Sequence, residues 1–354
     1  MDLTGVIAAE IEASGPIPFG RYVDLALYHP TLGFYADGGA GRRRDFITSA
    51  EVGPLFGAVV ARSLDAAWDD LGRPDDFSVV EAGAGSGRLA RSVLAAAPRC
   101  APAMRYVTVE VSDAQRAGHP DGVDARAEMP EPGGIGVVLA NELCDNLAFD
   151  LYERDGGLWW EIRVDDQDGA LAEIRVEPSA LPDWLAALDP LEPEAAVASL
   201  ETPLRVPDQY GARRWLERAL HQHDRGRVVV LDYAVDAYPV PEDRGWLRTY
   251  RGHDVGGDPL DRPGTQDITV DVAVDQLASV RPPDRSMSQA DWLAAHGIEG
   301  LVEEGRRIWR ENAAAPNVAA LTARSRIGEA EALCDPAGLG AFRVLEWDVA
   351  TITA

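Results

Sequence analysis

The sequence predicts an α/β protein with a mainly parallel sheet, because apolar runs of strand length alternate with an amphipathic run of helix length. Residues 77–83 (FSVVEAG) and 104–112 (MRYVTVEVS) are short apolar runs, and residues 87–97 (GRLARSVLAAA) between them have helical spacing. Strand, helix, strand in this order predicts a right-handed βαβ unit. Residues 135–142 (IGVVLANE) are a further apolar run, typical of a strand buried on both faces. Together these segments predict a Rossmann-like core.

The segments around this core predict helices before it and a different texture after it. Helical spacing of apolar residues predicts helices over 3–14, 19–27 and 52–71. Residues 33–51, rich in glycine and arginine, predict a loop between two of these helices. The other expectations are a weak strand at 123–125, an antiparallel meander at 151–177, an irregular or short-helical stretch at 178–208, a helix at 209–223, a buried strand at 225–233, a long loop at 234–264, a strand at 267–274, helices at 288–296 and 298–312, and a closing strand at 342–349.

The composition limits the partners. The 354 residues carry a formal net charge of -26 and contain no lysine, so we expect no binding to nucleic acid and no binding to an anionic membrane surface. An acidic surface can attract a basic protein, although ordinary solubilising charge is the simpler explanation. With 46% hydrophobic residues the chain can form one elaborated domain, which we favour, or two smaller ones.

Cysteine and histidine usage predicts neither disulfides nor a metal site. The cysteines Cys100, Cys144 and Cys334 are too few and too scattered for a disulfide framework, and no Cys-x-x-Cys pair occurs. The histidines are dispersed, and His221 and His223 point apart on a predicted helix. No secretory leader pattern and no apolar run of membrane-spanning length is seen, so we expect a soluble, cytoplasmic protein.

A glycine-rich turn follows the first strand of the predicted core. Gly83, Gly85 and Gly87 lie where the strand turns into its helix. Glycine permits positive φ and lets a ligand come close to the backbone, and the helix amino terminus presents N–H groups. Arg88 stands where the dinucleotide fingerprint has its last glycine, which disfavours NAD. The turn therefore predicts a nucleotide-like ligand of another kind.

Two acids flank this turn. Glu110 ends the second strand, where a carboxylate can accept hydrogen bonds from both hydroxyls of a ribose, so the combination predicts adenosine bound across neighbouring strand ends. Glu81 precedes the turn and has two interpretations. It would hold the amino group of the cofactor or brace the turn amides, and the sequence does not separate the two.

A polar cluster follows the apolar run of residues 135–142. Its members Asn141, Glu142 and Asp145 are the candidate catalytic residues, because strand ends in open α/β sheets face the ligand crevice. Glu142 and Asp145 could form a fork around a guanidinium, whose planar donors match carboxylates. Helix capping by Asp145 or Asn146 is the alternative, and Cys144 is more simply a packing residue than a nucleophile.

Several motifs occur in an order typical of one family. They are GPIPFGRYVDLALYHPTLGFY (15–35), RRRDFITSAEVGPLFG (42–57), VVEAGAGSGRLA (79–90), LANELCDNLAFDL (139–151), VVVLDY (228–233), PGTQDITVDV (263–272) and QADWLAAHGI (289–298). Together they resemble the MidA family of S-adenosylmethionine-dependent methyltransferases. The resemblance implies a class I methyltransferase with a mainly parallel seven-stranded sheet, an N-terminal helical cap and an inserted α+β segment. The corresponding segments are a cap with an active-site loop at 1–72, a cofactor-binding βαβ core at 73–150, an insertion at 151–225, and completion of the sheet with C-terminal helices at 226–354.

The resemblance also implies a cofactor, a substrate and site residues. S-adenosylmethionine would be bound by Glu81, Gly83, Gly85, Gly87, Glu110, Thr48 and Glu51. The segment with Asp45, Phe46, Thr48 and Glu51 would close over an active site that contains Asn141, Glu142 and Asp145. Mitochondrial members are complex I assembly factors that methylate an arginine of a complex I subunit, which implies an arginine-bearing protein substrate.

One departure from the family pattern leaves the acceptor open. Many relatives have Asn-Glu-Phe-Phe-Asp-Ala-Leu-Pro after the fourth strand, and this chain has NELCDNLA at 141–148. The acids are retained and the apolar positions differ. A small-molecule methyltransferase and a SAM-binding assembly factor without turnover remain as alternatives. The oligomeric state, a homodimer among the options, is also open.

Overall fold

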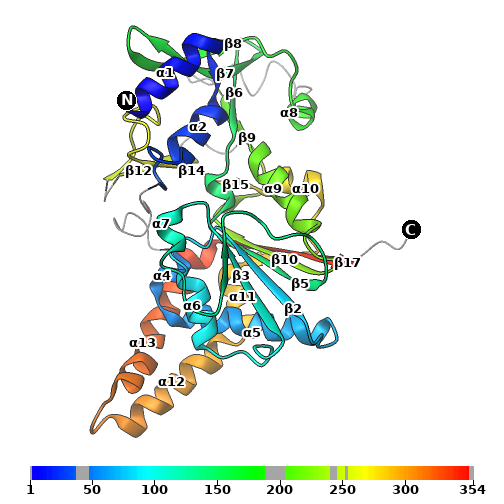
Figure 1. Ribbon diagram of the computed structural model, residues 1–354, viewed down its shortest axis with the longest axis vertical. Helices are drawn as coiled ribbons and strands as arrows, with labels where there is room; N and C mark the ends of the chain where they lie inside the picture. The colour runs from blue at the N-terminus through cyan, green and yellow to red at the C-terminus, as the bar shows by residue number, and fades with distance from the viewer. Residues whose placement is uncertain (1, 37–47, 189–203, 240–244, 252–253, 351–354) are drawn as a thin grey trace. The chain divides into compact units, whose positions relative to one another are not determined.

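The computed structural model describes residues 2–36, 48–188, 204–239, 245–251 and 254–350 (Figure 1). The chain divides into two compact units, each assembled from three separate stretches. The first unit contains residues 1–45, 144–216 and 234–281, and the second contains residues 46–143, 217–233 and 282–354.

The second unit contains a seven-stranded, mainly parallel sheet. Its strands, in spatial order, are β16 (Arg285–Ser288), β17 (Arg343–Ala350), β10 (Arg225–Asp232), β5 (Ile135–Asn141), β2 (Phe77–Ala82), β3 (Met104–Val109) and β4 (Asp124–Arg126). The strands from β10 to β4 pair in parallel, and β17 is antiparallel to both β10 and β16. The chain runs outward from β2 through β3 to β4 and then returns to the other side of β2 as β5. This reversal between β2 and β5 is a topological switch point, where ligands bind in open α/β sheets.

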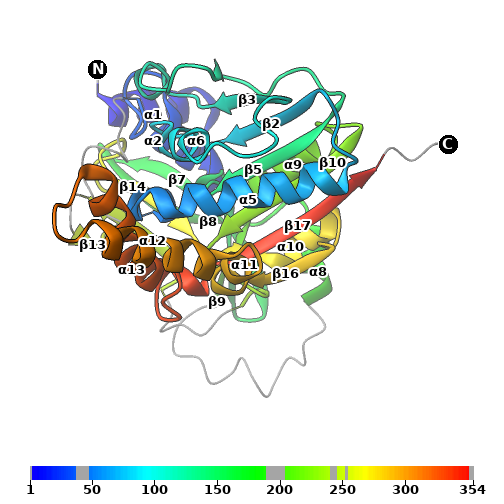
Figure 2. The same cartoon turned by 90° about the horizontal axis from the view of Figure 1, so that it is seen from below.

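Helix α5 (Pro54–Asp70) lies across one face of this sheet, beside α6 (Arg88–Ala95) (Figure 2). Pro54 suits the first helical position because its φ is already helical and no N–H is lost. The unit also contains α4 (Ser49–Val52), α7 (Asp113–Arg116), α11 (Gln289–Ala295), α12 (Ile298–Asn312), α13 (Val318–Leu333) and the 3-10 turn η3 (Leu339–Ala341).

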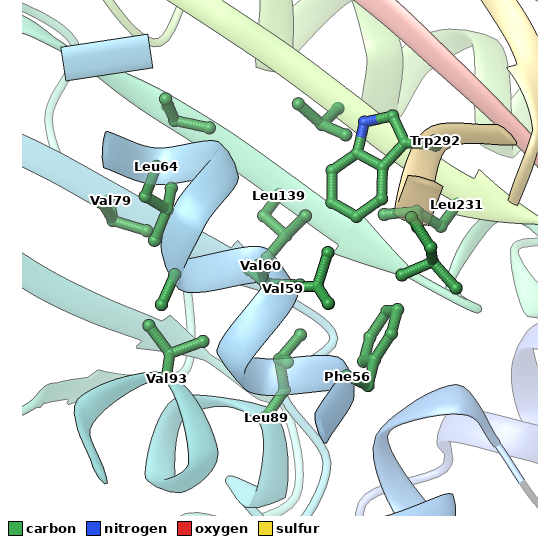
Figure 3. Close-up of a cluster of buried hydrophobic side chains, with 14 of the residues drawn as sticks. Phe56, Val59, Val60, Leu64, Val79, Leu89, Val93, Leu139, Leu231 and Trp292 are labelled. Carbon is green, nitrogen blue, oxygen red and sulfur yellow. The ribbon is translucent and has the colours of Figure 1, made fainter. Parts of the chain in front are cut away.

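A buried apolar cluster fixes α5, α6 and α11 against the sheet (Figure 3). Val60 of α5, Leu139 of β5, Leu231 of β10 and Trp292 of α11 are each no more than 2% exposed. Burial of such a side chain contributes about 1.5–3 kcal/mol. The Trp292 indole N–H donates to Glu346 Oε1 at 2.8 Å, so the ring is buried without an unpaired donor. Helix α11 is therefore held rigidly, and this fixes the position of its first residue, Gln289.

The first unit is built on an antiparallel five-stranded sheet. It contains β1 (Ile17–Pro18), β7 (Leu158–Gln167), β6 (Asp150–Asp155) and β9 (Leu204–Asp208), with β8 (Ala170–Val176) paired to β7. Helices α1 (Leu3–Ser14) and α2 (Phe19–Tyr28) share an apolar core with this sheet, and the ring centroids of Phe19 and Phe149 lie 5.7 Å apart in it. The other elements are the 3-10 turn η1 (Cys144–Asn146), α8 (Asp183–Leu188), α9 (Tyr210–Leu220, which ends in the second unit), β11 (Ala234–Val235), β12 (Leu247–Arg251), β13 (Asp254–Val255), β14 (Asp267–Val270), β15 (Val272–Ala273) and α10 (Val274–Val280).

The structure corrects the sequence expectations in three segments. The stretch predicted as irregular or short-helical at 178–208 contains β9, which pairs with β6, and the loop predicted at 234–264 contains β12, which pairs with β14. Both strands are short and depend on partners far along the chain, so their local pattern is weak. No helix was predicted at 318–333, where α13 has almost no segregation of apolar residues to one face.

Candidate active site

The glycine turn joins β2 to α6 beside the switch point of the sheet. Gly83, Gly85 and Gly87 have φ of 68°, 51° and 69°, in the left-handed region that favours glycine. A Cβ on Gly87 would lie 2.8 Å from a carbon of the His119 ring. The turn thus requires glycine both for its conformation and for its packing.

Glu110 follows β3 and contacts the turn directly. The Gly85 N–H donates to its Oε2 at 2.9 Å and the Ser112 N–H donates to its Oε1 at 2.8 Å. Burial raises the pKa of Glu110, and these two backbone donors partly oppose the rise. Each carboxyl oxygen can accept more than one hydrogen bond, so the residue can hold the turn and still accept from a ligand hydroxyl.

Glu81 is buried in β2, immediately before the turn. The Tyr106 hydroxyl donates to its Oε2 at 2.7 Å. Burial raises the pKa of Glu81 to about 7, against the lowering effect of that hydrogen bond and of a backbone donor, the N–H of Ala90. Neither partner belongs to the turn at residues 83–87, so both interpretations of Glu81 stay predictions.

Asn141 and Glu142 end β5, on the other side of the switch point. Glu142 has a φ of 52°, a left-handed conformation that is costly for a residue with a Cβ and is often found at functional sites. Its N–H donates to Leu231 O at 2.8 Å, which holds this backbone in place. The Asn141 Nδ2 donates to Glu142 Oε1 at 3.1 Å. The Asn141 Oδ1 is buried and has no hydrogen-bond partner among the described residues.

The backbone of Ser49 also holds the Glu142 carboxylate. The Ser49 N–H, at the start of α4, donates to Glu142 Oε1 at 2.9 Å. The Ser49 hydroxyl donates to Gln289 Oε1 at 2.9 Å, and Gln289 Nε2 donates to Leu333 O at 3.1 Å. Ser49 and Gln289 are both fully buried. A buried chain of hydrogen bonds therefore runs from α11 through α4 to Glu142.

A second contact fixes the junction between α4 and α5. The Leu55 N–H donates to Glu329 Oε2 at 2.8 Å, so an acid of α13 caps the amino terminus of α5. A Cβ on Gly53 would lie 2.3 Å from the same carboxylate, so a larger residue there would displace Glu329. The C-terminal helices thus position the segment that carries Ser49.

The other candidate residues are distributed between the units. Thr48 is the N-cap of α4, and its carbonyl accepts from the Glu51 N–H at 2.8 Å. Asp145 is buried in η1 of the first unit, whereas Asn141 and Glu142 belong to the second unit. Asp45 and Phe46 lie outside the described residues.

Sequence reasoning missed several residues that support the site. Ser49 and Tyr106 donate to the candidate acids, Gln289 holds Ser49, and His119 contacts the glycine turn. Gln289 and Ser49 lie inside motifs typical of the family, which was the available signal. For His119 the signal was only a histidine in the short segment between two parallel strands.

Comparison with known proteins decides the family. A family model described as "Putative S-adenosyl-L-methionine-dependent methyltransferase" matches residues 59–288. The chain is 30% identical over 300 residues to the Drosophila melanogaster protein arginine methyltransferase NDUFAF7 homolog, mitochondrial, covering 75% of this chain and 67% of that protein. It is 25% identical over 343 residues to the Danio rerio protein arginine methyltransferase NDUFAF7, mitochondrial, covering 84% and 77%. The chain belongs to the MidA family of S-adenosylmethionine-dependent methyltransferases.

A solved structure agrees with this family. A Burkholderia thailandensis protein bound to S-adenosyl-homocysteine aligns with a TM-score of 0.81 and 27% identity, over 99% of this chain and 92% of that one. The family, the α/β fold and the cofactor expected from the sequence are confirmed. The protein is a methyltransferase, and its cofactor is S-adenosylmethionine.

The expected cytoplasmic localisation is corrected by the same comparisons. The relatives from Drosophila melanogaster and Danio rerio are named as mitochondrial proteins, which contradicts the cytoplasmic assignment. Scarce cysteines are compatible with any reducing compartment, so that argument could not distinguish one such compartment from another.

Among the described residues, no helix of this methyltransferase is long and apolar enough to span a bilayer. In the same part of the chain, no three His, Cys, Asp or Glu side chains gather as metal ligands would.

Proposed function

We propose that this methyltransferase methylates an arginine side chain of a protein substrate, and that Glu142 binds the guanidinium. The relatives named above are protein arginine methyltransferases, which supports the acceptor. The observation that carries the assignment of Glu142 is its carboxylate, held at Oε1 by the Ser49 N–H and the Asn141 amide at the end of β5. These two donors orient the carboxylate, and a carboxylate matches the planar donors of a guanidinium.

The cofactor is assigned to the glycine turn and Glu110. The three glycines provide a backbone surface without Cβ atoms at the amino terminus of α6, and Glu110 is positioned to accept from ribose hydroxyls. Bound S-adenosylmethionine supplies an electrophilic methyl group on a sulfonium centre. Thr48, Glu51 and Glu81 stay predicted cofactor contacts, and for Glu81 bracing of the turn amides stays the alternative.

Glu142 then has two tasks in the transfer. It orients the guanidinium so that one nitrogen faces the methyl group in line, which is the main requirement of the reaction. The methylated nitrogen gives up one proton, and the carboxylate that accepts its N–H hydrogen bonds is placed to receive it. Asn141 Oδ1, a buried acceptor without a donor among the described residues, can accept a further guanidinium N–H.

The finer features of fold and assembly belong to the same proposal. We assign the seven-stranded sheet to the class I methyltransferase arrangement. The N-terminal cap, the insertion and the segment boundaries at residues 72, 150 and 225 stay predictions. So do the fork of Glu142 with Asp145, the role of Asp45, the absence of nucleic-acid and membrane binding, and a homodimer.

Labelled methyl transfer tests the acceptor. The purified protein is incubated with methyl-labelled S-adenosylmethionine and a whole-cell protein extract, and the labelled protein is hydrolysed to amino acids. We expect the label in methylarginine. Label in another amino acid, label only in the small-molecule fraction, or S-adenosylhomocysteine binding without any transfer would each overturn the arginine assignment.

Substitution of Glu142 tests the site. Glu142→Gln keeps the side-chain volume and removes the charge that binds the guanidinium, and we expect kcat to fall by about 10³-fold, in the range of one lost preorganised electrostatic contact. Affinity for S-adenosylhomocysteine, measured by calorimetry, should stay unchanged. Glu128→Gln, at an exposed acid of the same unit, is the control and should match the wild type in both measurements. Undiminished transfer by Glu142→Gln would remove Glu142 from the mechanism.

A further inference from the structure

His119 makes hydrogen bonds with both nitrogens of its ring. It lies between β3 and β4, shortly after α7. Its Nε2 lies 2.8 Å from Gly85 O, and its Nδ1 lies 2.8 Å from the Thr108 hydroxyl of β3. The ring therefore connects the middle of the glycine turn to the neighbouring strand.

The partners determine which ring nitrogen carries the hydrogen in the neutral ring. A carbonyl oxygen only accepts, so the Nε2 that contacts Gly85 carries a hydrogen. In the neutral ring Nδ1 is then the acceptor, and the hydroxyl of Thr108 donates to it. Thr108 is fully buried, so its hydroxyl needs such a partner. The pair thus fixes both the tautomer and the orientation of the ring.

The peptide groups of Gly85 are held from two sides. The Gly85 N–H donates to Glu110, and the Gly85 carbonyl accepts from His119. A Cβ on Gly87 would lie 2.8 Å from His119 Cδ2, so the ring also packs against the end of the turn. Glycine is the most flexible residue of the backbone, and a turn with three of them in residues 83–87 needs external contacts to keep one conformation.

We propose that His119 is a positioning residue for cofactor binding, which fixes the glycine turn in its binding conformation through the Gly85 carbonyl. The proposal rests on the placement of S-adenosylmethionine at this turn. A turn ordered in advance loses less entropy when the ligand binds, so the contribution of His119 falls on cofactor affinity. Turnover at saturating cofactor depends on it much less.

Three substitutions separate hydrogen bonding from packing. His119→Phe keeps a ring of similar size and loses both hydrogen bonds, and we expect the Kd of S-adenosylhomocysteine, measured by calorimetry, to rise about tenfold. His119→Gln offers a donor and an acceptor and should recover most of the affinity. Thr108→Val leaves the ring without its second partner and should weaken binding less than His119→Phe. Added to His119→Phe it should weaken binding no further, because the two residues act through one contact.

A second histidine provides the matched control. His223 lies in the same unit with its Nδ1 3.2 Å from Gly133 O, at the opposite ends of the strands, so His223→Phe should leave cofactor affinity unchanged. Hydrogen exchange of the peptide that covers residues 83–90 should accelerate in His119→Phe and not in His223→Phe. Wild-type affinity in His119→Phe, or equal losses in His119→Phe and His119→Gln, would overturn the positioning role. Unchanged binding in Glu110→Ala would instead overturn the cofactor placement itself.

Discussion

The carboxyl ends of β2 and β5 lie on either side of the same switch point, and the contacts that hold them are of opposite kinds. At the glycine turn after β2, the side chains of Glu110 and His119 hold the backbone of Gly85. At the end of β5, the backbone N–H of Ser49 holds the side chain of Glu142. In the proposed function, the first site presents peptide groups to the cofactor, and the second presents a carboxylate to the acceptor. Changes at the first should therefore act on affinity, and changes at the second on turnover.

The two sites also differ in the sequence separation of the residues that form them. Glu110 is 25 residues from Gly85, and His119 is 34 residues from it, within one βαβ unit and the segment after it. Ser49 is 93 residues from Glu142, and Gln289 is 240 residues from Ser49. The cofactor end is thus a local structure, whereas the acceptor end needs the complete second unit.

The largest expected effect on stability concerns Glu81, which precedes the glycine turn. Burial raises its pKa to about 7 in the folded protein, from 4.5 in an exposed position. The folded state then keeps a proton that the unfolded state releases between pH 4.5 and about 7, so the free energy of unfolding falls as pH rises through this window, by up to about 3 kcal/mol. In Glu81→Gln this part of the pH dependence should be absent. Denaturant unfolding at pH 5 and pH 8 measures it.

The exposed Glu128 serves as the reference for that measurement. Glu128→Gln should keep the pH dependence of the wild type, because this side chain is exposed. If Glu81→Gln lost as much stability between the two pH values as the wild type, Glu81 would be ionised in the folded protein. The acid that precedes the turn would then be charged rather than neutral.

Gly87→Ala tests whether the turn needs glycine for space as well as for conformation. The left-handed φ of 69° costs alanine about 1–2 kcal/mol, and the new Cβ would lie 2.8 Å from the His119 ring. His119 must then move away from Gly85. We expect a loss of about 2 kcal/mol in the free energy of unfolding and a roughly tenfold weaker affinity for S-adenosylhomocysteine, measured by denaturation and calorimetry.

Gly122 separates the two causes. Its φ of 89° is also positive, and a Cβ there would meet no atom within 4 Å. Gly122→Ala should therefore lose about 1 kcal/mol in the free energy of unfolding and bind S-adenosylhomocysteine as the wild type does. If Gly87→Ala behaved like Gly122→Ala, contact with His119 would have no part in binding.

The features that depend on residues close together in the chain could be predicted from the sequence. The apolar runs of β2, β3 and β5 and the acids and glycines at their ends follow rules of short range. The structure has β2 and β5 within one residue of their predicted ends, whereas β3 ends three residues earlier than the predicted run. The position of Glu142 beside the switch point follows from the order of the strands. What each of these residues contacts does not follow from such patterns.

Contacts between segments that are separate in the sequence could not be predicted in this way. Ser49 and Gln289 each lie in recognisable motifs, but nothing in either segment indicates that one hydroxyl and one amide meet across 240 residues. His119 has no pattern of its own, because its partners are a carbonyl and a buried hydroxyl that carry no sequence signature. Strand β12 was interpreted as loop because a short strand gains its stability from its partner β14.

Gln289→Leu gives the smallest expected effect on turnover and tests how Glu142 is held through Ser49. The substitution removes the acceptor of the Ser49 hydroxyl and the donor to Leu333 O, so α4 is less firmly held and the Ser49 N–H orients Glu142 less well. We expect kcat to fall about tenfold, as a small misplacement of a catalytic group does, with the Kd of S-adenosylhomocysteine unchanged. Steady-state kinetics with the labelled cofactor and calorimetry measure the two quantities.

Gln222→Leu is the matched control for this effect. Gln222 is 3% exposed in the same unit, and its Nε2 donates to Glu131 O at 3.3 Å. Both variants lose buried amide hydrogen bonds and should lose about 1–3 kcal/mol of stability. Only Gln289→Leu should lose turnover, because only Gln289 is connected through Ser49 to Glu142. Equal kcat in the two variants would mean that α4 holds Glu142 without help from α11. A loss of cofactor affinity in Gln289→Leu would mean that the two ends of the site are not independent.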